Sequence, residues 1–356
     1  MQLVVLDTSF SVLQVIDSYD SLIWTERYAN YGDFELVLPF LNGVLYYINF
    51  DNYLAIKESS TVMVIEQIEI ETSIESGNKL KVSGRSLESI LNRRIVWKQT
   101  ILNGKLQKGV QKLLNENIIQ PTDSSRKISN FTFKESSDTT ITGLTIEAQY
   151  TGDNLFDVIK SICDVYDLGF RISLSDTGFV FSLYNGKDRS YDQISNPYVI
   201  FSPMYDNLIS SNYLDSTKNL KTVTLVAGEG EGTARRTKEV PVDSGAGSGL
   251  SRREMYTDAR DISSTDGEES LTEAEYNSQL VERGKEKLTE YTRVTSVEGE
   301  ADTHSTSFTY GKDYNVGDIV EVVNEYGIET KARVIEFIRS ESESGYDMYP
   351  TFSIIE

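Results

Sequence analysis

The sequence repeats one pattern of apolar residues about 270 positions apart, and this repeat constrains the fold more than any other feature. The motif Val-Ile-Glu-x-Ile occupies residues 64–68 and residues 334–338, and Glu-Ser-Gly follows at 75–77 and 343–345. β-Branched runs bounded by turn residues predict strands, so each copy predicts a strand, a turn and a second strand. Two unrelated hairpins could resemble each other by chance. A duplicated β-barrel with other segments inserted between the copies explains the order better, and closure of each barrel would remove exposed strand edges that promote aggregation.

The remaining chain alternates between strand and helix signals. Apolar residues alternate over 34–40, which predicts a strand that Pro39 ends. Asp153 can cap one helix, and Thr272 with Glu275 forms a capping box before another, whose buried stripe is expected to extend to Tyr291. The expected helices are 85–94, 104–116, 154–166 and 272–291. Further strands are expected at 61–70, 79–84, 170–174, 179–184, 220–228 and 294–356, with weak strands near 131–133 and 141–150.

Residues 228–253 are small and polar almost throughout, which predicts a long mobile loop at the tip of a hairpin. The loop begins with Gly-Glu-Gly-Glu-Gly after an apolar strand, as some phosphate-binding loops do. Glu229 and Glu231 would repel a phosphate, and Pro241 interrupts any following helix. We therefore do not expect a nucleotide site there.

Composition excludes several classes of protein. A chain of 356 residues predicts two to four domains, and a net charge of −21 argues against sequence-specific nucleic-acid binding. The single cysteine, Cys163, rules out an intrachain disulfide, and the single histidine, His304, is expected at the surface. Neither a signal peptide nor a stretch of about 20 apolar residues is present, so no stable membrane insertion is expected. We also expect no metal and no cofactor.

Catalysis is the minority interpretation. Paired carboxylates could hydrolyse glycosidic bonds, but among 55 Asp and Glu residues such pairs are expected by chance. A Ser-His-Asp triad would have to use His304, and no Gly-x-Ser-x-Gly turn accompanies it. We therefore predict that the protein is not an enzyme and name no catalytic residue.

Charge is unevenly distributed along the chain. Residues 79–112 hold nine Lys or Arg against Glu88 alone, whereas residues 254–302 hold fourteen acids against five bases. Such blocks are often solvated faces, but in a self-associating protein they could meet across a subunit boundary. The candidate interface residues are Arg85, Arg93, Arg94, Lys98, Arg235, Arg236, Arg252 and Arg253.

The order of these segments resembles the baseplate-hub family of tailed phages and phage-like contractile particles. The resemblance rests on WTERYANYGDFELVLP (24–39), SGRSLESILNRR (83–94), SRREMYTDARDIS (251–263), LVERGKEKL (280–288) and YNVGDIVEVV (314–323). These segments span nearly the whole chain; no single motif is specific, and their order carries the resemblance.

The resemblance implies a fold of the α+β class, mainly β, with two β-barrel domains of the tail-tube type and inserted helical elements. The expected domains are 1–95, 96–205 and 206–356, the first and last being barrels. Three chains would form a pseudo-sixfold ring that joins a hexameric tail tube or distal tail protein to a trimeric central spike, beside other baseplate proteins. The protein would assemble in the bacterial host cytoplasm and reside at the tail tip of a virion or phage-like particle.

Two other functions stay open from the sequence. The many Tyr residues suit a receptor- or glycan-binding tail module, and the acids suit a carboxylate-dependent peptidoglycan hydrolase. Under the hub interpretation, Trp24 and Tyr28 are expected at a barrel rim. The pairs Gly32-Asp33 and Gly317-Asp318 are expected to turn the chain into core strands.

Overall fold

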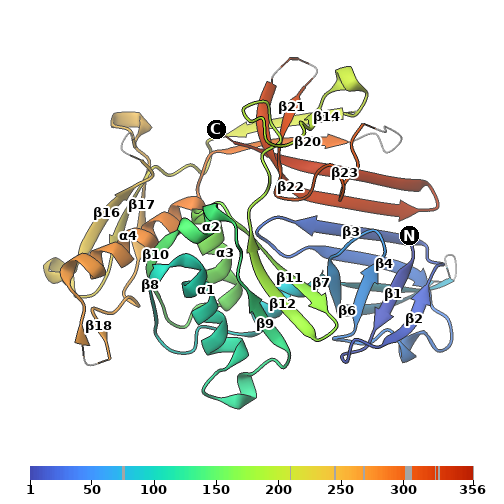
Figure 1. Ribbon diagram of the computed structural model, residues 1–356, viewed down its shortest axis with the longest axis horizontal. Helices are drawn as coiled ribbons and strands as arrows, with labels where there is room; N and C mark the ends of the chain where they lie inside the picture. The colour runs from blue at the N-terminus through green and yellow to red at the C-terminus, as the bar shows by residue number, and fades with distance from the viewer. Residues whose placement is uncertain are drawn as a thin grey trace.

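The structure, a computed structural model, describes residues 1–73, 77–208, 210–243, 246–267, 269–300, 307–324, 326–327 and 329–355. The fold is α+β and mainly β, as predicted. Two β units lie side by side, and the helical parts extend to one side of them (Figure 1). His304 and the first two residues of the 75–77 motif lie outside the described residues.

The first β unit encloses its own apolar core. Its strands lie in the order β3-β4-β7-β6-β5-β1-β2. Phe34, Leu36 and Leu38 are buried in β4, and this strand ends at Pro39, as their alternation predicts. The strands are β1 (Leu3–Leu6), β2 (Val12–Ile16), β3 (Ser21–Arg27), β4 (Asp33–Pro39), β5 (Tyr53–Ile56), β6 (Val62–Ser73) and β7 (Gly77–Ser86).

The prediction that Trp24 lies at the rim of the barrel is wrong. Its side chain is 0% exposed and packs in the core beside Phe34, at 6.1 Å between ring centroids. Side chains alternate along a strand, so Trp24 lies on the same face of β3 as Leu22, and this face is the one buried in the core. Tyr28 lies just beyond the end of β3, where its hydroxyl donates a hydrogen bond to the carbonyl of Asp167.

The inserted part packs helices against short sheets. The helix expected at 85–94 is a 3-10 segment over Leu87–Arg93, and α1 runs into a π-helical turn over Asn115–Ile119. Asn154, rather than Asp153, caps α3, because its side chain accepts a hydrogen bond from the backbone N–H of Phe156. The elements are β8 (Thr100–Lys105), α1 (Leu106–Leu114), β9 (Phe131–Lys134), α2 (Thr139–Gly143), β10 (Thr145–Tyr150), α3 (Leu155–Val165), β11 (Gly169–Ser175) and β12 (Gly178–Tyr184).

A helix packed on a small sheet forms a third part, called the α4 unit here. It comprises β15 (Val223–Ala227), β16 (Thr237–Pro241), β17 (Glu254–Asp258), β18 (Thr265–Asp266), β19 (Glu269–Ser270) and α4 (Glu273–Thr289). The capping box of Thr272 and Glu275 is confirmed. Tyr276, Leu280 and Leu288 are buried, but Tyr291 lies beyond the helix and is partly exposed.

The prediction that 228–253 is entirely loop is wrong. Residues Thr237–Pro241 pair with β15 as β16, and short 3-10 turns cover Gly232–Ala234 and Gly249–Ser251. Val240 is the one buried side chain in β16, and it packs in the core of the α4 unit. One apolar residue among polar ones is too weak a pattern to indicate a strand from sequence.

The second β unit has a separate core that includes Val334, Phe337 and Phe352. Its strands are β13 (Ile200–Phe201), β14 (Ser210–Ser216), β20 (Val294–Glu300), β21 (Ile319–Val323), β22 (Glu329–Ser342) and β23 (Gly345–Ile354). Gly317, at φ 98°, turns the chain toward β21, and Asp318 is buried in an ion pair with Arg189 at 2.7 Å. The remaining 3-10 turns are Val44–Tyr46, Ser124–Arg126 and Pro203–Tyr205.

Candidate functional site: the joint between the two β units

The two β units share the same order over five strands. The order β3-β4-β7-β6-β5 in the first unit matches β14-β20-β23-β22-β21 in the second, with the repeated motif in β6 and β22. The next strand differs, because β1 is antiparallel to β5 whereas β13 is parallel to β21. The units are therefore similar but unequal, as the sequence repeat predicts.

A β-bulge interrupts the motif in both units. Glu66 is skipped in the pairing of β6 with β7, and Ile335 is skipped in the pairing of β22 with β23. Opposite the first bulge, a Cβ atom on Gly84 would lie 1.8 Å from the carbonyl oxygen of Val64. Bulges increase the local twist and bend of a strand, so both hairpins are bent within the motif, at positions that differ by one residue.

The two units are continuous with each other rather than separately closed. Residues 336–342 of β22 pair antiparallel with residues 21–27 of β3, so that one sheet runs through both units. The expectation that each barrel closes on itself is not met among the described strands, since their path ends at β2 and at β14. We call the pairing of β3 with β22 the joint.

A buried ion pair lies at the centre of the joint. Arg339 of β22 donates a hydrogen bond to the carboxylate of Glu26 of β3, and both side chains are buried. Hydroxyl groups of Ser59, Thr61 and Tyr310 also donate to Glu26, at 2.8, 3.1 and 3.1 Å. Desolvated charges are tolerated where their hydrogen-bonding capacity is used, so this network specifies how the two units meet.

A second set of charges lies at the edge of the joint. Arg27 donates to Glu336 across the joint and to Asp33 within its own unit, both at 2.5 Å. Burial opposes the charged guanidinium, but the carboxylates of Asp33 and Glu336 outweigh it and raise the pKa of Arg27. Tyr19 donates to Glu341 at 2.6 Å farther along β22. Ion pairs and hydrogen bonds thus fix the register over the length of the joint.

The strands that correspond to β3 and β22 in the other unit are β14 and β6, and their corresponding edges have no strand partner in the described structure. β6 pairs with β5 up to Val64, and the backbone of Ile65 still bonds to Asp51 and Asn52; beyond Ile65, β7 is the only described strand that pairs with β6. β14 pairs with β20 and with no other described strand. Gln67, Glu69 and Ile70 of β6 are exposed, whereas Phe337 and Arg339 at matching positions of β22 are buried. One chain therefore contains one completed joint, between β3 and β22, and two further strands, β6 and β14, whose corresponding edges are not paired with each other.

The candidate interface residues of the first charge block stay close to the first unit. Arg85 forms an ion pair with Glu66 at 2.6 Å, and Arg93 forms one with Asp51 at 2.6 Å. Arg94 donates to the backbone carbonyl of Arg126, and Lys98 lines a cavity in the inserted part. The structure does not gather these four cations into one cluster.

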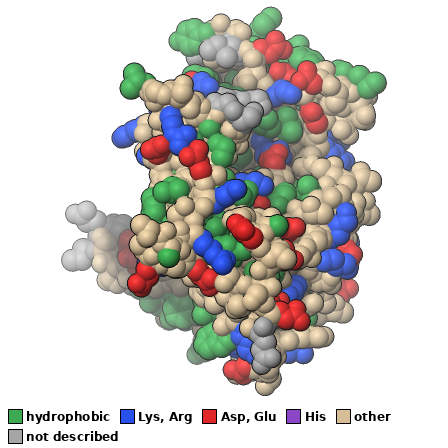
Figure 2. Space-filling model, turned by 90° about the vertical axis from the view of Figure 1, so that its left-hand side faces the viewer, with side chains coloured by type: hydrophobic (Ala, Val, Ile, Leu, Met, Phe, Trp, Pro, Cys, Tyr) green, Lys and Arg blue, Asp and Glu red, His purple; other side chains and the backbone are tan. Residues whose placement is uncertain are grey.

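The other four candidate residues lie on the α4 unit, far along the chain from the first four. Arg235 pairs with Asp258, Arg252 pairs with Glu239 and Glu254, and Arg253 donates to Thr217. Arg236 lies over the ring of Tyr276, 4.8 Å from its centroid. Lys, Arg, Asp and Glu side chains are interspersed on the face that the α4 unit presents (Figure 2). Their part in an interface stays a prediction.

The described residues contain no group of three or more His, Cys, Asp or Glu side chains placed to hold a metal ion. Cys163 is buried, and burial raises the pKa of its thiol. Within the described chain, no helix is long and apolar enough to cross a membrane.

Comparison with known proteins identifies the family. The family model for the siphovirus ReqiPepy6 Gp37-like protein matches residues 2–352. The chain belongs to this family. No curated protein matches the sequence.

Solved structures show that the Gp37-like chain has the fold of phage tail proteins. It is similar to the 43 kDa tail protein of prophage MuSo2 from Shewanella oneidensis, with a TM-score of 0.58 and 12% identity over 100% of this chain and 98% of that one. A tail protein from Neisseria meningitidis MC58 gives a TM-score of 0.56 and 12% identity, covering 99% and 95%. Prophage tail protein gp18 from Listeria monocytogenes EGD-e gives 0.55 and 13%, covering 99% and 94%. The predicted resemblance is confirmed at the level of family and fold: the chain is a siphovirus Gp37-like protein, and its fold is similar to that of prophage tail proteins.

Proposed function

We propose that this Gp37-like protein is the baseplate hub of a phage or phage-like contractile tail. Three chains form a ring with pseudo-sixfold symmetry, which joins the hexameric tail tube or distal tail protein to the trimeric central spike. The role is structural and not catalytic. It is carried out at the tail tip, among other baseplate proteins, after assembly in the bacterial host cytoplasm.

One observation carries this proposal: the chain contains one completed joint and both halves of another. In the completed joint, the distal part of β22 pairs with β3. The part of β6 that corresponds to the distal part of β22, and the strand β14 that corresponds to β3, each have an edge without a strand partner in the described structure. An unfilled edge offers backbone N–H and C=O groups that pair readily with another strand. β14 of one chain therefore pairs with β6 of the next, as β3 pairs with β22 within a chain.

The register of this second joint follows from the first. If the paired residues are followed across the sheet from Val64, through β7 and β4, the residue reached on β3 is Thr25. If they are followed from Val334, through β23 and β20, the residue reached on β14 is Tyr213. Thr25 pairs with Ile338 in the completed joint. Since Ile68 matches Ile338 in the repeated motif, we place Tyr213 opposite Ile68 of the neighbouring chain.

A chain with two similar units suits a junction between different symmetries. Three chains present three identical surfaces to a trimeric spike and six similar units to a hexameric tube. The net charge of −21 also suits a channel through which a polyanion such as DNA passes without adhering.

Cysteine cross-linking tests the proposed ring. Ile68→Cys combined with Tyr213→Cys should give disulfide-linked dimers and trimers on oxidation, because paired strands hold opposite Cβ atoms about 4.5–5.5 Å apart. The native Cys163 is buried and should not interfere. Leu225→Cys with Ile68→Cys is a matched control, because Leu225 is 44% exposed and Tyr213 is 41% exposed but Leu225 lies on the α4 unit.

The proposal requires linked trimers from the first pair and none from the control pair. A protein that stays monomeric in the presence of tube and spike proteins would contradict the hub function. Cross-linked trimers that negative-stain images show to lack a central channel would contradict it as well.

A further inference from the structure

The α4 unit is connected to the rest of the protein by two chain crossings that lie side by side. Residues 217–222 lead from β14 into the unit, and residues 290–293 lead back to β20. β14 and β20 pair with each other up to these crossings, and the backbone N–H of Lys221 donates to the carbonyl of Tyr291 at 2.8 Å. We call the two crossings the neck. Because both leave the second β unit at the same place, the neck can act as a single hinge.

The α4 unit has an apolar core of its own. This core includes Val226, Val240 and Leu280, and among the described residues it shares no member with the core of the inserted part. The unit lies to one side of the inserted part, with α4 packed toward β10 and α3 (Figure 1). A body with a separate core can keep its fold when it moves away from its neighbour.

Buried polar groups join the α4 unit to the inserted part, and we call this region the docking contact. Gln149 of β10 is 2% exposed, and its side-chain amide donates to the carbonyl of Ser263 at 3.2 Å and to the side chain of Gln279 at 3.1 Å. The backbone N–H of Ser263 donates to the Gln149 side chain at 2.6 Å. Arg283 donates to the Gln149 carbonyl at 3.2 Å. One glutamine thus holds three residues of the α4 unit.

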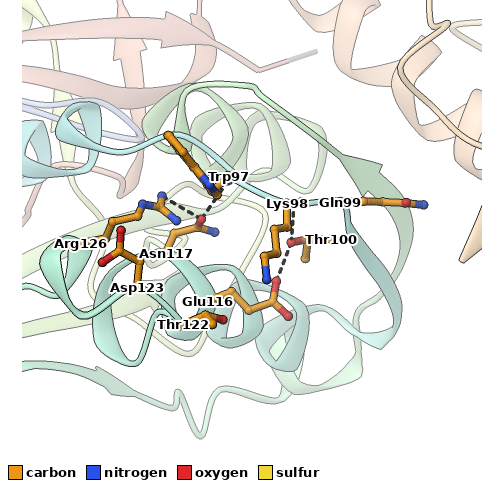
Figure 3. A pocket seen from close by; sticks show the side chains of 9 residues that line it. All are labelled: Trp97, Lys98, Gln99, Thr100, Glu116, Asn117, Thr122, Asp123 and Arg126. Carbon is orange, nitrogen blue, oxygen red and sulfur yellow. Dashed lines mark hydrogen bonds between the residues drawn. The ribbon is translucent and has the colours of Figure 1, made fainter. Parts of the chain in front are cut away.

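A further bond comes from the segment before β8. Figure 3 shows the side chain of Gln99 directed away from the other side chains around the cavity at Trp97. It donates to the backbone carbonyl of Thr265 in β18 at 2.7 Å. Hydrogen bonds of this kind are exchanged for bonds to water when two bodies separate, so each adds little net free energy to docking.

The docking contact also buries carboxylates. Glu282 and Glu286 are each 4% exposed, and Tyr150 donates a hydrogen bond to Glu286. One carboxylate oxygen of Glu282 and one of Asp153 are buried and have no hydrogen-bond partner among the described residues. Buried polar groups without partners oppose the arrangement that buries them. These carboxylates favour separation, whereas the hydrogen bonds of Gln149 favour docking.

We propose that the α4 unit is a hinged arm, which leaves the inserted part as an intact body when the carboxylates of the docking contact are ionised. The arm turns about the neck. Neither β unit has to open, because the neck contributes no residue to the core of either one. The inference does not depend on the ring, since the neck and the docking contact lie within one chain.

The groups around Glu286 determine how pH acts on the arm. From β10, the turn after it and α3 they are Tyr150, Asp153, Asp157 and Tyr166, and from α4 they are Glu282, Arg283, Lys287 and Glu290. Acids outnumber cations among them, so ionised Glu286 adds a buried negative charge to an acidic site. Burial raises the pKa of Glu286 to about 7, and docking therefore weakens as pH rises toward that value.

Pulsed electron paramagnetic resonance of the full chain tests the arm. Spin labels at Lys108→Cys in α1 and Leu225→Cys in the α4 unit report the distance between the two bodies; the native side chains are 60% and 44% exposed, and Cys163 is buried. Labelled protein is diluted with unlabelled protein, so that only distances within one chain are measured. Between about pH 5 and about pH 8 the ratio of docked to separated protein should fall on the order of 70-fold, as a pKa that changes from about 7 to 4.5 on separation requires. A population at longer distances should appear.

Two variants control the experiment. Glu286→Gln cannot ionise at this position, so its label distances should be the same at both pH values. Labels at Leu225→Cys and Arg260→Cys form the matched pair, because both lie in the α4 unit and the Arg260 side chain is 67% exposed. Their distance should not change with pH, since the arm moves as one body.

Three results would overturn the proposal. The first is an unchanged distance between α1 and the α4 unit from about pH 5 to about pH 8. The second is a pH-dependent distance within the pair at positions 225 and 260, which would show that the unit unfolds instead of turning. The third is separation of Glu286→Gln to the same extent as the wild type, which would remove the role of this carboxylate.

Discussion

The carboxylate of Glu26 and the guanidinium of Arg339 form a buried ion pair although the residues are 313 positions apart in the sequence. Glu26 belongs to the first β unit and Arg339 to the second, so the pair connects the two copies of the repeat. The ring of Tyr310 lies under Arg339, 5.0 Å from its guanidinium carbon, and its hydroxyl donates to Glu26. One aromatic residue thus contacts both charges.

Replacing one member of this pair should destabilise the protein strongly. Arg339→Gln leaves the Glu26 carboxylate buried without its cation, and we expect the free energy of unfolding to fall by about 3–5 kcal/mol. Urea denaturation followed by circular dichroism measures the change.

Two further variants control this experiment. Glu26→Gln together with Arg339→Gln removes both charges and should recover part of the loss. Arg260→Gln removes an exposed arginine and should change stability by no more than about 0.5 kcal/mol. Equal stability of Arg339→Gln and Arg260→Gln would show that the joint does not depend on the ion pair.

The bulge in the first unit should not tolerate a side chain at position 84. In Gly84→Ala the new methyl group would lie 1.8 Å from the carbonyl oxygen of Val64, so the strands must separate. We expect a loss of stability of about 1–3 kcal/mol or more, as for other overpacked sites. Gly143→Ala is the control, since no atom lies within 4 Å of the added methyl group and residue 143 ends a helix. Thermal unfolding that ranks Gly143→Ala below Gly84→Ala would contradict this prediction.

Docking of the α4 unit should weaken as pH rises. Burial raises the pKa of Glu286 to about 7, and the neighbouring Glu282 adds to the effect, although Arg283 and a hydrogen bond from Tyr150 oppose it. Between the ordinary pKa near 4.5 and about 7, the folded protein holds a proton that the unfolded chain has released. The stability contributed by this group is therefore greatest below about pH 4.5 and declines until about pH 7, by on the order of 3 kcal/mol.

Glu286→Gln tests the pH dependence. The variant cannot ionise at this position, so its advantage over the wild type in free energy of unfolding should grow from about pH 5 to about pH 7 and then stay constant. Hydrogen exchange of the α4 amides over this range measures the local effect. A constant difference between the two proteins at all pH values would contradict the assignment.

The start of α4 should depend on its capping box. Thr272 accepts a hydrogen bond from the backbone N–H of Glu275, and the Glu275 carboxylate accepts one from the backbone N–H of Thr272. Thr272→Ala removes the first bond, and we expect a loss of about 0.5–2 kcal/mol. Faster hydrogen exchange confined to the first turn of α4 would confirm the local origin, and unchanged exchange there would contradict it.

The sequence predicted the elements that depend on neighbouring residues. The duplicated hairpins, the strand that ends at Pro39 and the capping box at Thr272 all follow from local patterns, and the structure confirms them. The strand around Val240 was missed because it has one buried apolar residue among polar ones, although its partner β15 is the preceding strand in the sequence.

The joint and the docking contact of the α4 unit could not be predicted, for a different reason. Glu26 and Arg339 belong to strands whose pairing no local pattern specifies, although a charged residue at an inward position of an apolar strand is a usable signal of a buried partner. Gln149 bonds to Gln279 only because β10 and α4 pack together, although 130 positions separate the two residues. Long-range pairing, rather than composition or periodicity, decides both sites.

Since β3 and β22 belong to one polypeptide, their association sacrifices no translational freedom of separate molecules. The intervening chain sets a high effective concentration of each strand for the other, and dilution cannot separate them. Cleaving the backbone between the two units would remove that advantage, and the fragments would then come apart at low concentration.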